Sequence, residues 1–286
     1  MFDLKPQHEY LVGIDSDGCA FDTMELKHKE CFIPTFIKHY KLQGVSKYAR
    51  EAAEFVNLYS KTRGCNRFHA LVDQLGLLVR RKELKDRGYP IQVPQGVVEW
   101  TKRETKLGNP ALEAAVNQTN DPDLRQALAW SREVNARIAE MVSGVPPFPF
   151  VRPCLEKLAG RADMLVCSAT PNEALTAEWK EHDIDRFVAG ICGQETGTKK
   201  ETLTNAAKYP IGQVLMVGDA PGDLEAAKAN NCLFFPINPG DEEQSWQRLC
   251  EEGIERFLGG TFAGTYQQQL LQAFDACLPD RPPWEE

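Results

Sequence analysis

Short runs of consecutive apolar residues alternate along the chain with longer segments of helical periodicity. The runs are nearly uninterrupted, which is typical of strands buried on both faces of a parallel sheet. Five strands are predicted, at Tyr10–Ile14, Met164–Cys167, Phe187–Cys192, Val214–Val217 and Cys232–Ile237. Helices are predicted beside them at 153–159, 172–181, 200–207 and 223–230. This alternation predicts a doubly wound, Rossmann-like α/β core with a parallel sheet.

The long interval between the first and second strands has helical periodicity throughout. Apolar residues recur at helical spacing, as at Val134, Ile138 and Met141. Helices are predicted at 24–39, 47–59, 67–81, 95–106 and 123–142. The proline-rich stretch 145–149 then predicts a return to the core. We therefore expect an all-helical domain at 22–147, inserted into a discontinuous core made of 1–21 and 148–286.

Two further helices are predicted near the C-terminus, at 242–258 and 266–278. Tyr266, Leu270 and Phe274 are spaced four residues apart, which predicts one helix face packed on the core. The last residues, 279–286, are rich in proline and charge, and we expect them to be frayed.

The amino-acid composition disfavours some classes of binding partner. The formal net charge of the 286-residue chain is -8, which disfavours binding to nucleic acid or to an anionic membrane surface. The nine cysteines are scattered singly, and the N-terminal segment has no apolar signal core. These features predict a cytoplasmic protein with reduced thiols. We also expect a monomer or a homodimer.

Chemically versatile side chains follow four of the predicted strands. They are Asp15 and Asp17, then Ser168, then Lys199 or Lys200, then Asp219 and Asp223. Each has an ordinary structural explanation, because serine and aspartate cap helices and lysine is usually solvated. Ligands of open α/β sheets, however, bind at the carboxyl ends of the strands. A hydroxyl, a cation and four carboxylates at one edge suit metal-assisted phosphoryl transfer.

Four motifs in this order resemble those of the haloacid dehalogenase-like superfamily. They are Asp15-Ser16-Asp17-Gly18, Ser168, Lys199, and Gly218-Asp219 with Asp223. The helical insertion after the first strand resembles the cap domain of that family. The resemblance implies that Asp15 is a nucleophile that forms an aspartyl-phosphate and that Asp17 is the general acid/base. It also implies that Ser168 binds the transferring phosphoryl group.

The resemblance further implies a Mg²⁺ cofactor. Asp15, Asp219 and the backbone carbonyl of Asp17 would hold the ion directly, and Asp223 would support it either directly or by positioning another ligand. Lys199 would pair with the phosphoryl charge and steady the nucleophile.

The sequence departs from the family pattern at two motifs. Cys19 stands where a threonine is usual, and no proline follows the lysine, so Lys200 remains an alternative to Lys199.

Asp17 favours a phosphatase that acts on a small phosphate monoester, because an alcohol leaving group needs a proton. A phosphomutase acting on a sugar phosphate would use the same residues, and a non-catalytic module that binds a phosphorylated ligand is the alternative from another class.

Recognition of the rest of the substrate is expected from the helical domain. Arg63, Asn66 and Arg67 offer many N–H donors in one predicted break between helices. The alternative is an ordinary loop in which Asn66 caps the next helix.

Overall fold

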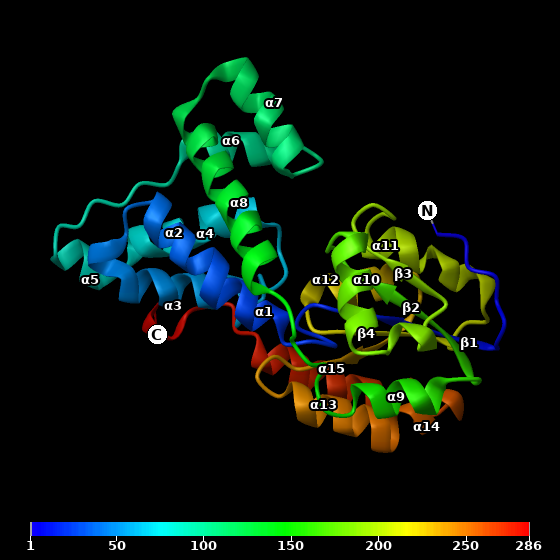
Figure 1. Cartoon of the computed structure of the whole chain (residues 1–286). Coiled ribbons are helices and arrows are strands. Elements are labelled where there is room, and N and C mark those ends of the chain that lie inside the picture. Colours follow the sequence, from blue (N-terminus) through cyan, green and yellow to red (C-terminus); the bar gives the residue numbers. More distant parts are fainter. Residues whose placement is uncertain (1, 286) are drawn as a thin grey trace. The chain divides into compact units, whose positions relative to one another are not determined.

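The computed structural model describes residues 2–285 and divides them into two compact units. The first unit contains residues 2–24 and 143–279, and it holds the whole sheet. The second contains residues 25–142 together with the chain from residue 280 on. Figure 1 shows the first unit with its sheet and the second as an assembly of helices.

The first unit is built on a five-stranded parallel sheet of order β3-β2-β1-β4-β5. The strands are β1 (Tyr10–Ile14), β2 (Ala162–Cys167), β3 (Gly190–Cys192), β4 (Val214–Gly218) and β5 (Leu233–Pro236). β1 occupies the centre, with Val12 paired to Met164 of β2 and to Leu215 of β4. The predicted α/β class and all five strands are confirmed. β3 is shorter than predicted, because Asp185–Phe187 forms a 3₁₀ turn before it.

Helices cover both faces of this sheet. They are α9 (Val151–Leu158), α10 (Asn172–Glu181), α11 (Lys199–Thr202), α12 (Pro221–Ala229), α13 (Glu242–Arg248), α14 (Ile254–Leu258) and α15 (Thr265–Cys277). Successive strand residues alternate faces. Val12 and Ile14 pack in a cluster with residues of α9, α10, α13 and α14, whereas Leu11 packs in another with α12. A strand with both faces buried reads as an unbroken apolar run, which explains the sequence pattern.

The edge strand β5 is covered by α15. Leu270 and Phe274 of α15 are buried, as the spacing predicts. The Gln267 side-chain oxygen accepts a hydrogen bond of 3.1 Å from the backbone N–H of Phe234. This bond satisfies a polar group that an edge strand would otherwise expose.

The second unit is helical, as predicted. Its helices are α1 (Thr23–Leu26, which begins in the first unit), α2 (Ile33–His39), α3 (Ser46–Asn57), α4 (Arg67–Arg80), α5 (Lys82–Asp86), α6 (Gln95–Arg103), α7 (Asn109–Thr119) and α8 (Pro122–Met141). A π-helical segment, Lys27–Phe32, joins α1 to α2. Helices α5 and α7 were not predicted. Among the residues described, no helix is both long and apolar enough to cross a membrane.

The C-terminal segment corrects the expectation of a frayed tail. Trp284 lies against the helical unit, with its ring 4.2 Å from the guanidinium carbon of Arg81 and edge-on to Phe55. Glu285 forms an ion pair of 3.4 Å with Arg80. The expected boundaries placed this segment with the core, but it belongs to the helical unit. The cation–π contact, the ring contact with Phe55 and the ion pair together attach this segment to the helical unit.

Candidate active site

The parallel sheet brings the predicted core residues to one edge. Asp15 follows β1 directly, and its backbone N–H donates to the carbonyl of Val217 in β4 at 3.0 Å. Ser168 follows β2, and its N–H donates to the carbonyl of Cys192 at the end of β3. Asp219 follows β4. The carboxyl ends of parallel strands meet at one edge, so residues more than 200 positions apart become neighbours.

Asp15 lies at the centre of a buried charge cluster. The Nζ atom of Lys199 is 2.7 Å from Asp15 Oδ2 and 2.5 Å from Asp223 Oδ1. Burial raises the pKa of the Asp15 carboxyl well above its ordinary value, Lys199 opposes this shift, and Asp223 and Asp219 add to it. Burial also opposes the charge of Lys199, but the carboxylates outweigh it and raise the Lys199 pKa. Lys200 is exposed, so the geometry favours Lys199 for the predicted role.

Three carboxylates crowd together in this cluster. Asp15, Asp219 and Asp223 each offer an oxygen, and these oxygens lie within 4.8 Å of one another. One ammonium group cannot balance three carboxylates, so the cluster carries surplus negative charge. A hard, all-oxygen donor set of this kind suits Mg²⁺, which usually keeps several waters. The residues present therefore fit the predicted cofactor.

In the loop after β4, the Asp223 side chain packs closely against the backbone of residues 218–220. Asp223 Oδ2 accepts hydrogen bonds from the backbone N–H groups of Asp219 and Ala220, at 3.2 and 3.1 Å. A Cβ atom at Gly218 would lie only 2.5 Å from the Cβ of Asp223. Glycine at this position therefore lets Asp223 turn back toward Asp15.

Asp17 stands apart from the charge cluster. Its Oδ1 accepts a hydrogen bond from the hydroxyl of Thr23, and its Oδ2 accepts one from Thr170, both at 2.5 Å. The two threonines come from the segments after β1 and β2. The carboxylate predicted to move protons is thus oriented in part by two hydroxyl groups. The Asp17 side chain is not among the three clustered carboxylates, and the contribution of its backbone carbonyl to a metal site stays a prediction.

The turn between Asp17 and the helical unit has well-defined geometry. Gly18 has φ of 76°, a conformation that favours glycine, and its N–H donates to the carbonyl of Phe21. Cys19 is fully buried, and its thiol lies 3.7 Å from the carbonyl of Val217. A thiol in place of a threonine hydroxyl therefore keeps a weak contact with β4.

Ser168 is buried close to the same edge. It is 3 % exposed, and its hydroxyl oxygen accepts a hydrogen bond of 3.2 Å from the backbone N–H of Thr170. Its oxygen keeps its own proton to donate, which suits the predicted contact with a phosphoryl oxygen.

The three residues predicted to bind substrate in the helical unit have partners within that unit. Asn66 caps α4 by accepting from the N–H of Phe68, and it donates to the carbonyl of Leu107. Arg63 is buried and donates to the carbonyl of Leu58 at 2.8 Å. The cap that Asn66 forms is the one that the alternative interpretation of this loop required.

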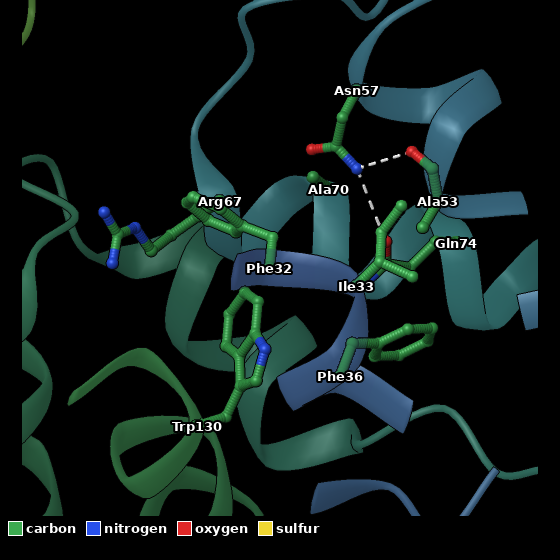
Figure 2. A pocket seen from close by; sticks show the side chains of 9 residues that line it. All are labelled: Phe32, Ile33, Phe36, Ala53, Asn57, Arg67, Ala70, Gln74 and Trp130. Atoms are coloured by element: carbon green, nitrogen blue, oxygen red, sulfur yellow. Dashed lines mark hydrogen bonds between the residues drawn. The ribbon is translucent and has the colours of Figure 1, made fainter. Parts of the chain in front are cut away.

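Arg67 is held by α8. Its guanidinium donates to the Ser131 hydroxyl at 3.0 Å and to Asn135 Oδ1 at 2.7 Å, and it lies over the ring of Phe32. Burial lowers the Arg67 pKa to about 10. Figure 2 shows Arg67 with Phe32 and Trp130 among the side chains that line a small cavity of the helical unit.

Several residues of the site were not found from the sequence. Thr170 had a signal, since it stands two residues beyond Ser168 in the same strand-end motif. Thr23 is six residues from Asp17 and carries no motif. Their roles arise from side-chain hydrogen bonds across loops, which residue spacing does not encode.

No protein-family model matches the chain, and no curated protein sequence matches it. Solved structures do resemble it. A haloacid dehalogenase-superfamily hydrolase from Geobacter sulfurreducens is 15 % identical, with TM-score 0.38, and the match covers 79 % of this chain and 86 % of that one.

Two further neighbours cover more of the chain. A candidate phosphoglycolate phosphatase from Lactobacillus delbrueckii is 13 % identical, with TM-score 0.49 and coverage of 88 % and 99 % of the two chains. A candidate β-phosphoglucomutase from Bacteroides vulgatus is 12 % identical, with TM-score 0.45 and coverage of 90 % and 91 %. Similarity at this level concerns the fold and assigns no substrate. The sheet order and the inserted helical unit confirm the predicted Rossmann-like α/β core with an inserted helical domain.

Proposed function

We propose that the protein is a Mg²⁺-dependent phosphatase that hydrolyses a small phosphate monoester through an aspartyl-phosphate on Asp15. The observation that carries this proposal is the position of the Asp15 carboxylate, which lies against Lys199 and among like charges at the carboxyl edge of the sheet. Crowded carboxylates cost free energy unless a cation offsets them, so such a cluster is characteristic of a functional site.

In the first half of the reaction, an Asp15 oxygen attacks phosphorus and the bond between phosphorus and the ester oxygen breaks. Asp17 gives its proton to the leaving oxygen, which departs as an alcohol. Lys199 and the Ser168 hydroxyl stabilise the charge on the phosphoryl oxygens. Bound Mg²⁺, held by Asp15, Asp219 and Asp223, would neutralise part of that charge and fix the phosphoryl group in line.

In the second half, Asp17 accepts a proton from water while the water oxygen attacks phosphorus. The acyl-phosphate bond breaks, Asp15 is regenerated as a carboxylate and inorganic phosphate leaves. The hydroxyls of Thr23 and Thr170 orient the Asp17 carboxylate for both proton transfers.

The identity of the alcohol is a separate part of the proposal. Arg63, Asn66 and Arg67 remain the residues predicted to recognise it, and their partners within the helical unit make this a hypothesis to be tested residue by residue. A cytoplasmic location is also proposed, supported by nine cysteines that are all free thiols.

The test is a panel of phosphate monoesters assayed for release of inorganic phosphate, with Mg²⁺ and with excess chelator. We expect release with Mg²⁺, loss of release in chelator and recovery when Mg²⁺ is restored. Full activity in chelator would contradict the metal-dependent mechanism. Transfer to a second sugar position, dependent on a bisphosphorylated sugar and with negligible phosphate release, would establish the mutase instead.

A further inference from the structure

Ser16 stands between the two predicted catalytic carboxylates and is completely buried. Its hydroxyl has two side-chain partners, both from α10. The indole Nε1 of Trp179 donates to Ser16 Oγ at 3.0 Å, and Ser16 Oγ donates to Glu178 Oε2 at 3.0 Å. An indole N–H can only donate, so the serine oxygen must accept from it and direct its own proton to the carboxylate. The hydrogen bonds therefore run in one direction, from Trp179 to Ser16 and from Ser16 to Glu178.

The backbone of Ser16 faces the nucleophile. Its N–H donates to Asp15 Oδ1 at 2.8 Å, while Asp15 Oδ2 contacts Lys199. Both oxygens of Asp15 are thus held, one by the cation and one by Ser16. A shift of Ser16 would move the N–H and rotate the Asp15 carboxylate away from its line of attack.

The same segment of chain also holds Asp17. Thr170, just before α10, donates to Asp17 Oδ2, and Trp179 near the other end of the helix holds Ser16. The Trp179 ring also packs edge-on against Phe21, with ring centroids 6.0 Å apart. One helix and the turn before it therefore contact successive residues of the nucleophile loop.

We infer that Trp179 and Glu178 are positioning residues that act through Ser16 on the nucleophile Asp15. This inference rests on the proposed function, because it assumes that Asp15 is the nucleophile. Its specific content is that the indole N–H matters, and not only the bulk of the buried ring.

The activity test separates these two contributions. Trp179→Phe keeps an aromatic ring and removes the N–H, and Ser16→Ala removes the hydroxyl. We expect each to lower kcat on p-nitrophenyl phosphate by about tenfold and to change KM less than about twofold. The double variant should lose no more than Ser16→Ala alone, because Ser16→Ala already removes the hydrogen bond that Trp179→Phe removes.

Trp130→Phe is the matched control. The Trp130 indole is buried in the helical unit, and its Nε1 has no hydrogen-bond partner among the described residues. The control loses no hydrogen bond and should keep the wild-type kcat. Wild-type kcat in Trp179→Phe would overturn the inference, as would a loss that simply tracks a lower melting temperature.

A second readout does not depend on turnover. Protein labelled with 5-fluorotryptophan should give one ¹⁹F resonance for each of its five tryptophans, and Trp179→Phe identifies the one from Trp179. We expect Asp15→Asn to shift the Trp179 resonance and leave that of Trp130 in place. In a Ser16→Ala background, Asp15→Asn should no longer shift it.

The two readouts distinguish failure of the inference from failure of the proposed function. If no phosphate ester is hydrolysed but the resonance shifts through Ser16, the coupling stands and the phosphatase is rejected. If hydrolysis is normal in the variants and the resonance does not respond, the phosphatase stands and the coupling is rejected.

Discussion

Both units of the molecule bury charged side chains, but they do so in opposite ways. In the core, the Asp15, Asp219 and Asp223 carboxylates crowd within 4.8 Å of one another. In the helical unit, buried Arg81 forms ion pairs with Glu51 at 2.6 Å and Glu83 at 3.0 Å. Arg81 is paired with opposite charges, whereas Asp15 lies against two like charges as well as Lys199, and crowded like charges favour binding of a further cation. Because both sets of charges are buried, the sign of the neighbouring charges, and not burial itself, distinguishes these two clusters.

The largest effect is expected from Asp15→Asn. This change removes the nucleophile and should lower kcat by at least about 1,000-fold. It also removes one of the crowded charges, so the melting temperature should not fall. Steady-state kinetics and thermal unfolding measure the two quantities. Turnover that survives in a preparation free of contaminating phosphatase would place the nucleophile elsewhere.

The second-largest effect is expected from removal of the Lys199 ammonium group. Lys199→Ala leaves buried Asp15 and Asp223 without their shared partner, and we expect a loss of about 3–5 kcal/mol in the free energy of unfolding in chelator. Added Mg²⁺ should restore part of this loss. Urea unfolding measures both.

Lys200→Ala is the matched control for that change. Lys200 is exposed, so its removal should change the free energy of unfolding by less than about 0.5 kcal/mol. Equal losses in the two variants would contradict the assignment of Lys199.

Arg67 tests the helical unit. Arg67→Ala removes hydrogen bonds to Ser131 and Asn135, and we expect a loss of about 1–2 kcal/mol in the free energy of unfolding. If Arg67 also recognises the alcohol, KM for the physiological ester should rise more than KM for a compact ester such as p-nitrophenyl phosphate. Unchanged KM values on both would leave Arg67 with a structural role only.

The smallest effect concerns acid stability. A hydrogen bond from Lys38 lowers the Glu133 pKa to about 2 against the opposing effect of burial, and His39 and Arg137 contribute in the same direction. The stabilisation is present above the ordinary glutamate value near 4.5 and is lost as the pH falls toward 2. Because these pairs are partly exposed, Glu133→Gln should cost only about 1 kcal/mol at neutral pH.

Unfolding of wild type and Glu133→Gln at several pH values tests this prediction. The difference between them should shrink as the pH falls. A difference that grows as the pH falls would contradict the prediction that ionised Glu133 stabilises the fold.

The core was more predictable than the helical unit for a physical reason. A parallel sheet converts strand ends into neighbours, so Asp15, Ser168 and Asp219 could be brought together from sequence order alone. Helix packing gives no such rule. The N–H donors of Arg67 could equally have bound a ligand or a neighbouring helix. Helix α7 was not predicted because Leu112 is its only buried residue.

The prediction of a frayed C-terminal segment was wrong because Trp284 contacts the helical unit. Its proline and charge content is typical of a frayed end, and no periodicity precedes Trp284. Trp284 contacts Arg81 and Phe55, and Glu285 pairs with Arg80; contacts between residues so far apart in the chain cannot be read from local sequence.

The place of Trp284 has a consequence for excising the insertion. A protein reduced to its core by joining residue 24 to residue 143 would keep a C-terminal segment whose binding surface had been deleted. The indole would then be exposed on a loose end, where apolar side chains promote aggregation. A minimal core should therefore also stop at Pro279, so that the insertion is excised as two pieces of sequence rather than one.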